Sequence, residues 1–236
     1  VCDVGGGTTD LSLFEVHFSD QQLQVKRIRV SDHILLGGDN IDLAVAIELE
    51  RRAADAGFSL SPAQWRFLLT EARRIKEVAL TERAAEEMLA VSIPGSGSSL
   101  IGGTIAISLP RAVLTDLVVE GFFPRCSAEE HLTKSNTALR QTGLHFAHDP
   151  AVTKHLAHFL TGIASTAESH IHVDGVLFNG GTLRPQQLRG RLLDVIASWQ
   201  GGVRPEELAG ADVEFAVSRG AALSGYLSHR LGRHTI

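Results

Sequence analysis

Apolar and polar residues alternate over residues 1–30 in the manner of β-strands. Residues 9–18 and 23–30 are together rich in Leu, Val, Ile and Phe, and polar residues separate the two runs. A short apolar run at residues 1–4 precedes them and ends in consecutive glycines. Apolar runs bounded by turn residues favour strands. We therefore predict an antiparallel meander of three strands, with the glycines in its first turn.

Helical periodicity begins near Gly38. Apolar residues recur at intervals of three and four over residues 41–56 and again over residues 61–80. Asp39 or Asn40 is the expected N-cap of the first helix. The second helix opens with a Ser-Pro pair, in which the serine caps the helix and the proline occupies its first turn.

Strands and helices alternate over the rest of the chain. The expected strands cover residues 88–93, 104–109, 173–178 and 213–216, and the expected helices cover residues 111–123, 151–167, 185–199 and the stretch that ends near residue 231. The hairpins expected near the start of the chain and the strand–turn–helix units expected towards its end together predict a mixed α/β fold. We expect one subdomain from residues 1–37 plus 119–236, and an inserted smaller α+β subdomain from residues 38–118.

Composition narrows the class of protein. The chain has 236 residues, of which 44% are hydrophobic and 21% charged, as in ordinary globular proteins. A net charge of −5 argues against nucleic acid as the main partner. No apolar run approaches the roughly 18 residues that a membrane span needs, so no membrane partner is expected. Only Cys2 and Cys126 occur, which makes the cytoplasm the expected compartment. Because the chain opens on Val1 without an initiator methionine, we expect a fragment of a longer protein.

The first glycine turn, residues 3–10, reads Asp-Val-Gly-Gly-Gly-Thr-Thr-Asp. Consecutive glycines let backbone N–H groups face one concavity and cradle phosphate oxygens. A carboxylate repels a phosphate unless a cation lies between them, so Asp3 implies Mg²⁺, held through its waters. Thr8 can hydrogen-bond a γ-phosphate, and Asp10 can orient a water. The alternative is an ordinary hairpin turn, for which three glycines are excessive.

Two more glycine turns follow predicted strands. Residues 36–42 read Leu-Gly-Gly-Asp-Asn-Ile-Asp, and residues 176–185 read Val-Leu-Phe-Asn-Gly-Gly-Thr-Leu-Arg-Pro. A helix start behind such a turn adds a favourable dipole for an anion. The alternatives are a helix N-terminal turn with an aspartate cap, and a strand-to-helix turn with a surface arginine.

Together these turns resemble the nucleotide motifs of the DnaK-type 70-kDa heat-shock chaperones and their actin-like relatives. The first matches Asp-x-Gly-Gly-Gly-Thr-x-Asp, and the second resembles Leu-Gly-Gly-x-x-x-Asp. The third resembles the adenosine motif Gly-Gly-Ser-Thr-Arg-x-Pro, although Arg184 here adjoins Pro185 directly. The resemblance covers nearly the whole chain except residues 124–172, and it suggests a divergent bacterial DnaK-like protein.

The resemblance implies a role for each matching residue. It places Mg²⁺ beside Asp3, the γ-phosphate on Thr8 and the attacking water beside Asp10. The other nucleotide contacts that it implies are Gly5, Gly6 and Gly7 for the β- and γ-phosphates, Gly37 and Gly38 at the start of the smaller subdomain, Gly180, Gly181 and Thr182 near the ribose and α-phosphate, and Arg184 on the adenine face.

Two segments match the family less closely. The adenosine-clamping helix of the family shows Glu-x-x-Lys, and residues 71–81 fit it in two registers. One register uses Lys76, and the other uses Arg74, so both are candidate nucleotide contacts; a charged, solvated helix face is the alternative. Glu214 stands where the family has an aspartate near the nucleotide, and a structural role for its segment is an equal alternative.

The implied architecture is that of an actin-like ATPase, in which an RNase-H-like lobe carries an inserted smaller subdomain and binds ATP or ADP with Mg²⁺. The implied partners are the nucleotide, an N-terminal lobe of the same protein, and a co-chaperone or exchange factor. By resemblance, the first phosphate loop and the catalytic lysine belong to that N-terminal lobe. We therefore expect the 236-residue chain alone not to turn over ATP at a useful rate.

Other functions fit the sequence less well. The chain has no Gly-x-x-x-x-Gly-Lys-[Ser/Thr] and no Gly-x-Ser-x-Gly, which disfavours a P-loop NTPase and an α/β-hydrolase. A lobe of an actin-like sugar or acetate kinase stays open, as does a degenerate lobe that serves as a protein-interaction scaffold. His155 and His158 share a predicted helix face, but without a ligand partner at convincing spacing they are expected to be surface or packing residues.

Overall fold

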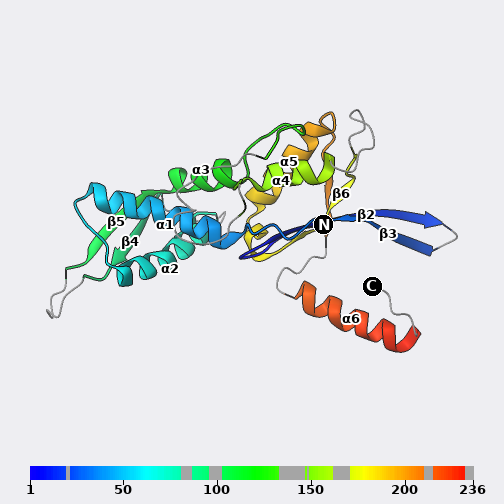
Figure 1. Ribbon diagram of the computed structural model, residues 1–236, viewed down its shortest axis with the longest axis horizontal. Helices are drawn as coiled ribbons and strands as arrows, with labels where there is room; N and C mark the ends of the chain where they lie inside the picture. Colours follow the sequence, from blue (N-terminus) through cyan, green and yellow to red (C-terminus); the bar gives the residue numbers. More distant parts are fainter. Residues whose placement is uncertain are drawn as a thin grey trace.

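The computed structural model is a mixed α/β arrangement, with six α-helices, one four-stranded sheet and two two-stranded sheets among the residues it describes (Figure 1). It describes residues 1–19, 22–80, 87–95, 103–132, 147, 149–161, 171–209 and 215–231. The predicted mixed α/β class is confirmed.

The four-stranded sheet begins with the predicted meander. Its strands β1 (Cys2–Val4), β2 (Thr9–Ser19) and β3 (Gln22–Val30) pair in antiparallel fashion. Strand β7 (Phe178–Asn179) joins β1 in parallel, which gives the order β3-β2-β1-β7. The parallel pairing brings the third glycine turn, which follows β7, to the same end of the sheet as the first.

Successive side chains of β1 point to opposite faces of this sheet. Cys2 and Val4 are buried in the core, whereas Asp3 between them is half-buried. Alternate residues of a strand point to opposite faces. Because Asp3 is directly paired with Asp10 of β2, the two carboxylates share the face that lies away from the core.

A second group of elements lies at the left of Figure 1. It comprises α1 (Gly38–Asp55), α2 (Pro62–Ala79), β4 (Met88–Ile93), β5 (Ile105–Pro110) and α3 (Arg111–Phe122). Strands β4 and β5 form an antiparallel pair, and every second residue of β4 is buried. As predicted, Ser61 caps α2: its side chain accepts the Gln64 N–H at 3.3 Å.

The predicted cap of α1 is wrong. The helix begins at Gly38 with Gly37 in the cap position, so neither Asp39 nor Asn40 caps it. Asn40 is the third helical residue, and its Oδ1 accepts the Gly37 N–H at 2.8 Å. The chain enters the helix two or three residues earlier than expected because the first glycine turn packs directly on Gly37, as described below.

The remaining elements close the fold. Helices α4 (Val152–Thr161) and α5 (Gln186–Trp199), the short helix η2 (Gly181–Leu183), and strands β6 (Gly175–Val176) and β8 (Glu206–Glu207) lie around the middle of Figure 1, between that group and the tip of the β2–β3 hairpin. Residues 162–167, the end of the expected helix over 151–167, lie outside the described residues.

The single buried strand predicted over residues 173–178 is divided between two sheets. Its first part, β6, pairs in parallel with β8, and its second part, β7, pairs in parallel with β1. The Leu177 carbonyl accepts the Cys2 N–H at 2.9 Å on one edge, and the Val176 carbonyl accepts the Leu208 N–H at 2.9 Å on the other. The segment is therefore one extended run with a different neighbour on each edge.

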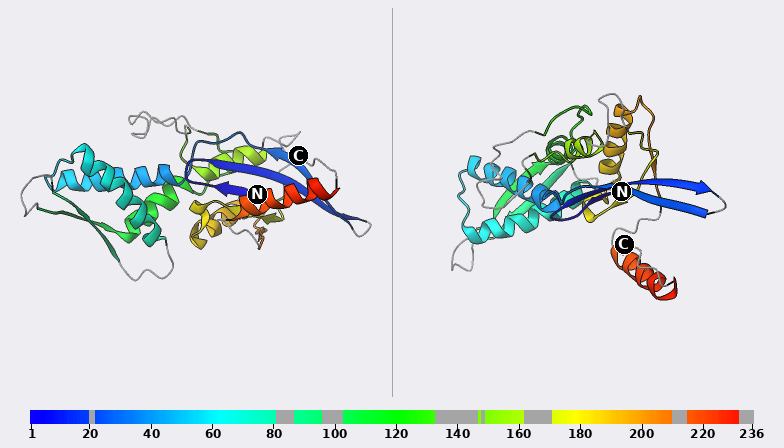
Figure 2. Two further views of the ribbon diagram at one scale, coloured as in Figure 1. Left: turned by 90° about the horizontal axis from the view of Figure 1, so that it is seen from below. Right: turned by 45° about the vertical axis from the view of Figure 1, so that its right-hand side comes forward.

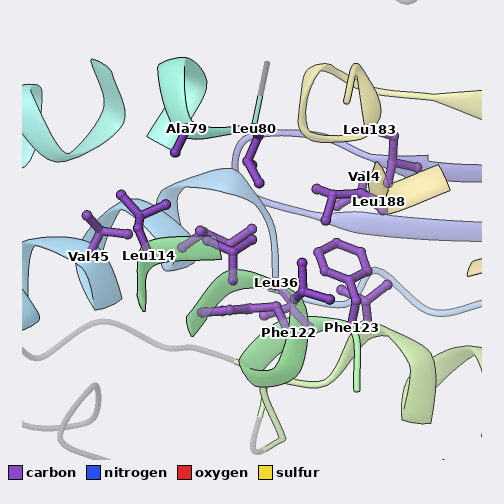
Figure 3. Close-up of a cluster of buried hydrophobic side chains, with 14 of the residues drawn as sticks. Val4, Leu36, Val45, Ala79, Leu80, Leu114, Phe122, Phe123, Leu183 and Leu188 are labelled. Atoms are coloured by element: carbon purple, nitrogen blue, oxygen red, sulfur yellow. The ribbon is translucent and has the colours of Figure 1, made fainter. Parts of the chain in front are cut away.

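One continuous hydrophobic core joins the two groups of elements. It contains Val4 of the sheet, Val45 of α1, Ala79 of α2, Leu114 of α3, and Leu183 and Leu188 near the third turn (Figure 3). Phe123 is the largest fully buried side chain of the described residues and lies among them. The core therefore fixes the three glycine turns relative to one another.

The last described helix, α6 (Ala216–Leu231), lies apart from the body in Figure 1 and in the right view of Figure 2. The strand predicted over residues 213–216 does not extend to Ala216, which begins this helix, and residues 213 and 214 lie outside the described residues. Within the described part of the chain, no helix combines the length and apolar character required to cross a membrane.

Candidate functional site

The three glycine turns meet at one carbonyl oxygen. Gly5 O of the first turn accepts the Gly38 N–H of the second turn at 3.0 Å and the Thr182 hydroxyl of the third turn at 2.8 Å. A further hydrogen bond, from Asp39 N–H to Gly6 O at 2.8 Å, joins the first two turns. Segments separated by more than 170 residues therefore form one junction.

Gly37 permits the closest approach at this junction. A Cβ atom on Gly37 would lie 2.4 Å from Gly6 O and 2.6 Å from Gly5 O, so only glycine fits there. The N–H groups of Gly37, Gly38 and Asp39 all donate within the protein, to Asn40, Gly5 and Gly6 respectively. The second turn thus holds the first turn in place and does not offer these three amides to a ligand.

Gly180 is the second position where the backbone requires glycine. Its φ is +85°, and a Cβ there would lie 2.2 Å from Val4 O and 2.6 Å from Asp3 Oδ1. Left-handed backbone of this kind is costly for other residues. The third turn therefore packs against the strand that carries Asp3, while Gly6 and Gly7 of the first turn are exposed at its tip.

Both carboxylates of the first turn have polar partners. Asn179 Nδ2 donates to Asp3 Oδ2 at 2.7 Å, and the buried Oδ1 of Asn179 has no partner among the described residues. On the neighbouring strand, the Thr8 hydroxyl donates to Asp10 Oδ2 at 3.0 Å, and His33 Nδ1 lies 2.5 Å from Asp10 Oδ1. Asp10 is thus oriented from both sides.

An open cleft of about 820 Å³ lies beside the junction, a volume typical of small-molecule sites. Six predicted residues line it: Gly6, Gly38, Lys76, Gly181, Thr182 and Arg184. The predicted residues that do not line it are Asp3, Gly5, Gly7, Thr8, Asp10, Gly37, Arg74 and Gly180. Glu214 lies outside the described residues.

The cleft walls mix cations with apolar surface. Arg73, Lys76, Arg184 and Arg189 face it, as do Asp39, Asp42 and Glu77. Apolar lining comes from Ile41, Leu80, Pro185 and Leu188. Four cations against three carboxylates leave this lining with a small excess of positive charge. An anion attached to a flat ring system suits such a surface, because the excess charge can pair with the anion while the apolar residues cover the ring.

Lys76 and Asp42 form a nearly dry ion pair at the back of the cleft. Lys76 Nζ lies 2.6 Å from Asp42 Oδ1, and both side chains are only 10% exposed. Burial raises the pKa of the Asp42 carboxyl above its ordinary value, while the hydrogen bond and charge of Lys76, and the charge of Arg73, pull this pKa back. Lys76 Nζ also lies 3.4 Å from Gly38 O, which ties α2 to the junction.

The two registers predicted for residues 71–81 place their basic side chains, on α2, in different directions. Arg73 lines the cleft with Lys76, and its Nε lies 3.5 Å from Glu77 Oε1. Arg74 faces away, donating to Glu71 at 2.9 Å and to the Ala90 carbonyl of β4 at 3.3 Å. Arg73, and not Arg74, is therefore positioned beside Lys76.

Arg189 of α5 fixes the turn that carries Arg184. Its guanidinium donates to Leu183 O at 2.9 Å, to Arg184 O at 2.5 Å and to Glu207 Oε1 at 2.6 Å. With its donors used in this way, Arg189 holds the third turn against β8. Arg184 extends from the end of η2 at the rim of the same cleft.

Several residues of the site had no sequence prediction. Arg73, Glu77 and Leu80 share one helix face with the predicted Lys76 at the i, i+3, i+4, i+7 spacing, so helical phase alone could have found them. Asn179 directly precedes the third turn, and that adjacency was a usable signal. Asp42 is the last residue of the second glycine motif, but its pairing with Lys76 had no local signal, and His33 had none either, because their partners lie on other elements.

The described histidines near α4 make ordinary contacts. His155 Nε2 lies 2.9 Å from Asp149 O, and burial lowers the pKa of its imidazole. Among the described residues, no three His, Cys, Asp or Glu side chains gather closely enough to hold a metal ion. Comparison of the chain with protein-family models and with curated proteins finds no match to either.

Proposed function

We propose that this chain is the ATP-binding lobe of a DnaK-like chaperone ATPase with an actin-like fold, and that it binds ATP or ADP together with Mg²⁺. The observation that carries the proposal is the meeting of three glycine turns at Gly5 O beside a cleft with four cationic side chains. The partners proposed with it are an N-terminal lobe of the same protein and a co-chaperone or exchange factor.

The arrangement of strands supports the same proposal. An antiparallel meander, β3-β2-β1, is extended by β7, which is parallel to β1, and the glycine turns lie beyond the ends of β1 and β7. Ligands of α/β folds bind at the carboxyl ends of parallel strands. The two-stranded sheet of β4 and β5, with α1 and α2, then corresponds to the inserted smaller subdomain.

The residues around Asp3 fit Mg²⁺. Mg²⁺ prefers hard oxygen ligands and is commonly held by one or two carboxylates together with waters and substrate phosphates. Asp3 offers a carboxylate, and Asn179, whose Nδ2 donates to that carboxylate, has a buried Oδ1 without a partner among the described residues. When bound, the ion would neutralise charge on the phosphates.

Different residues of the chain would contact the phosphates and the adenosine. Gly6 and Gly7, exposed at the tip of the first turn, can donate backbone N–H groups to phosphate oxygens. Arg73 of α2 and Arg184 at the end of η2 both line the cleft, and each can pair with phosphate or cover the base. Asp10, oriented by Thr8 and His33, can hold a water. We expect this chain to bind nucleotide without useful turnover.

Isothermal titration calorimetry with ATP, with and without Mg²⁺, tests the proposal. We expect binding that Mg²⁺ strengthens, and we expect Asp3→Asn to remove that strengthening. Absence of heat at millimolar ATP under both conditions would instead favour the interaction scaffold.

Two neighbouring arginines provide a matched comparison. Arg73→Ala should weaken ATP binding about tenfold, because a charge-assisted contact of about 1.4 kcal/mol is lost. Arg74→Ala should leave the affinity unchanged, because Arg74 contacts Glu71 and β4 rather than the cleft. Equal effects of the two substitutions would place the nucleotide elsewhere on the chain.

A further inference from the structure

The hairpin of β2 and β3 carries an apolar stripe on its outer face, which we define by Phe14, Val16, Phe18, Leu23 and Val25. The register pairs Val16 with Val25 and Phe18 with Leu23, and directly paired residues share one face. These five side chains are between 39 and 75% exposed. An uncovered stripe of this kind is uncommon on a monomer and marks a surface that packs against something.

The inner face of the same hairpin has the opposite character. Its residues near the tip are polar, for example His17 paired with Gln24 and Glu15 paired with Lys26. Closer to the body, Arg29 donates to Phe159 O of α4 at 2.8 Å and lies 5.2 Å from the Phe159 ring. Helix α4 therefore covers the base of the inner face, and the outer face is the apolar one.

Helix α6 has an apolar stripe that also lacks a cover. Ala216, Gly220, Leu223 and Leu227 recur at helical spacing on one side, and Leu223 is 58% exposed. Among residues 217–230, all except the half-buried Ser228 are exposed.

The composition of α6 makes it dependent on packing. Isolated helices of about 15 residues are marginal in water, and each internal glycine costs about 1 kcal/mol relative to alanine. Helix α6 has 16 residues and contains Gly220 and Gly225. It therefore needs tertiary contacts to remain helical.

We propose that α6 docks, within its own chain, along the outer face of the β2–β3 hairpin. In Figure 1, α4 lies above the hairpin and α6 below it, and in the left view of Figure 2 α6 runs across the hairpin. Five residues, 210–214, lie between the body and residue 215, enough to span up to about 17 Å. Helix α6 therefore lies on the side of the hairpin opposite to α4.

The dimensions of the two surfaces agree. A helix of 16 residues is about 24 Å long, and the 11 residues of β2 extend about 37 Å. Small residues on the α6 stripe, Ala216 and Gly220, let the helix axis approach the sheet, while Leu223 and Leu227 reach the apolar side chains. Docking makes the lobe a helix–sheet–helix sandwich, in which both faces of the hairpin are covered.

Cysteine cross-linking tests which face α6 contacts. In a Cys126→Ser background, Val16→Cys with Leu223→Cys should form an intramolecular cross-link under mild oxidation. The matched control is His17→Cys with Leu223→Cys, because His17 is the next residue on β2 and points to the inner face; it should cross-link much less. Equal yields from both pairs, no cross-link at all, or covalent dimers alone would overturn docking within the chain.

Hydrogen exchange supplies a second, independent readout. Amides of α6 should exchange on the order of 100-fold more slowly than in a free peptide of the same sequence. Val25→Asp on the outer face should abolish this protection, whereas Lys26→Asp on the inner face should preserve it. Both substitutions are at exposed positions, so the rest of the fold should persist. Unprotected α6 amides in the unsubstituted chain would overturn the proposal.

Discussion

Lys76 Nζ and Asp42 Oδ1 lie 2.6 Å apart in a part of the cleft where both side chains are 10% exposed. Removing one member of a buried ion pair leaves the other charge without compensation, which costs more than the pair itself contributes. The pair joins α1 to α2 directly behind the second glycine turn. Its integrity therefore affects both the fold and the shape of the cleft.

Lys76→Met should destabilise the protein by about 3 kcal/mol at neutral pH. Burial already raises the pKa of Asp42, and loss of Lys76 removes the hydrogen bond and charge that lower it. A raised pKa in the folded state means that the folded protein holds this proton more tightly than the unfolded chain, so stability falls as pH rises through that pKa. The cost of Lys76→Met should therefore be small in acid and grow towards neutral pH, as measured by urea unfolding at several pH values.

A double variant checks the cause of that loss. Lys76→Met combined with Asp42→Leu removes both charges and should recover most of the stability at neutral pH, because an apolar pair of similar volume replaces a desolvated ion pair. The recovery should also remove the pH dependence. A double variant as unstable as Lys76→Met would show that packing, and not the unpaired carboxylate, limits stability.

Gly180→Ala should destabilise the protein by about 3 kcal/mol, the sum of a left-handed backbone penalty and an overpacking penalty. The φ of +85° and the 2.2 Å approach to Val4 O leave no room for a methyl group. Gly181 is the matched control, because a Cβ there would meet nothing within 4 Å. Urea midpoints should shift for Gly180→Ala and stay close to wild type for Gly181→Ala; similar shifts would contradict the assigned geometry.

The local sequence pattern was enough to predict those helices and strands that are specified by residues close together in the sequence. Alternation over residues 9–30 and the Ser-Pro start at Ser61 specify the hairpin and the start of α2, because β-pattern and N-cap chemistry act within a few residues. The division of residues 173–178 between two sheets was not predictable, since it depends on which distant strands pair with each edge.

The candidate site shows the same limit. Glycine turns can be found by inspection, but the role of Gly37 and Gly38 depends on a contact with Gly5 that only the folded chain creates. Their amides were expected to face a phosphate, and instead they bind the first turn. The pairing of Lys76 with Asp42 likewise requires α1 and α2 to lie side by side, which no spacing in the sequence encodes.

Arg29→Ala should loosen the hairpin from α4. The guanidinium makes both a hydrogen bond to Phe159 O and a contact with the Phe159 ring, and each is worth about 1 kcal/mol. Amides of β3 near Arg29 should then exchange faster in hydrogen-exchange mass spectrometry. Arg27→Ala is the control, because Arg27 is paired with Phe14 on the outer face and should leave exchange at the base of the hairpin unchanged.

Thr182→Val should weaken the junction of the three turns. The substitution keeps the shape of the side chain but, among the described residues, leaves Gly5 O with the Gly38 N–H as its one partner, at a cost of about 1 kcal/mol. Thr182→Ser retains the hydroxyl and should recover most of that stability. If nucleotide binds at the junction, calorimetry should also show weaker ATP binding for Thr182→Val than for Thr182→Ser. Equal stability of the two variants would mean that the hydroxyl contributes nothing to holding the turns together.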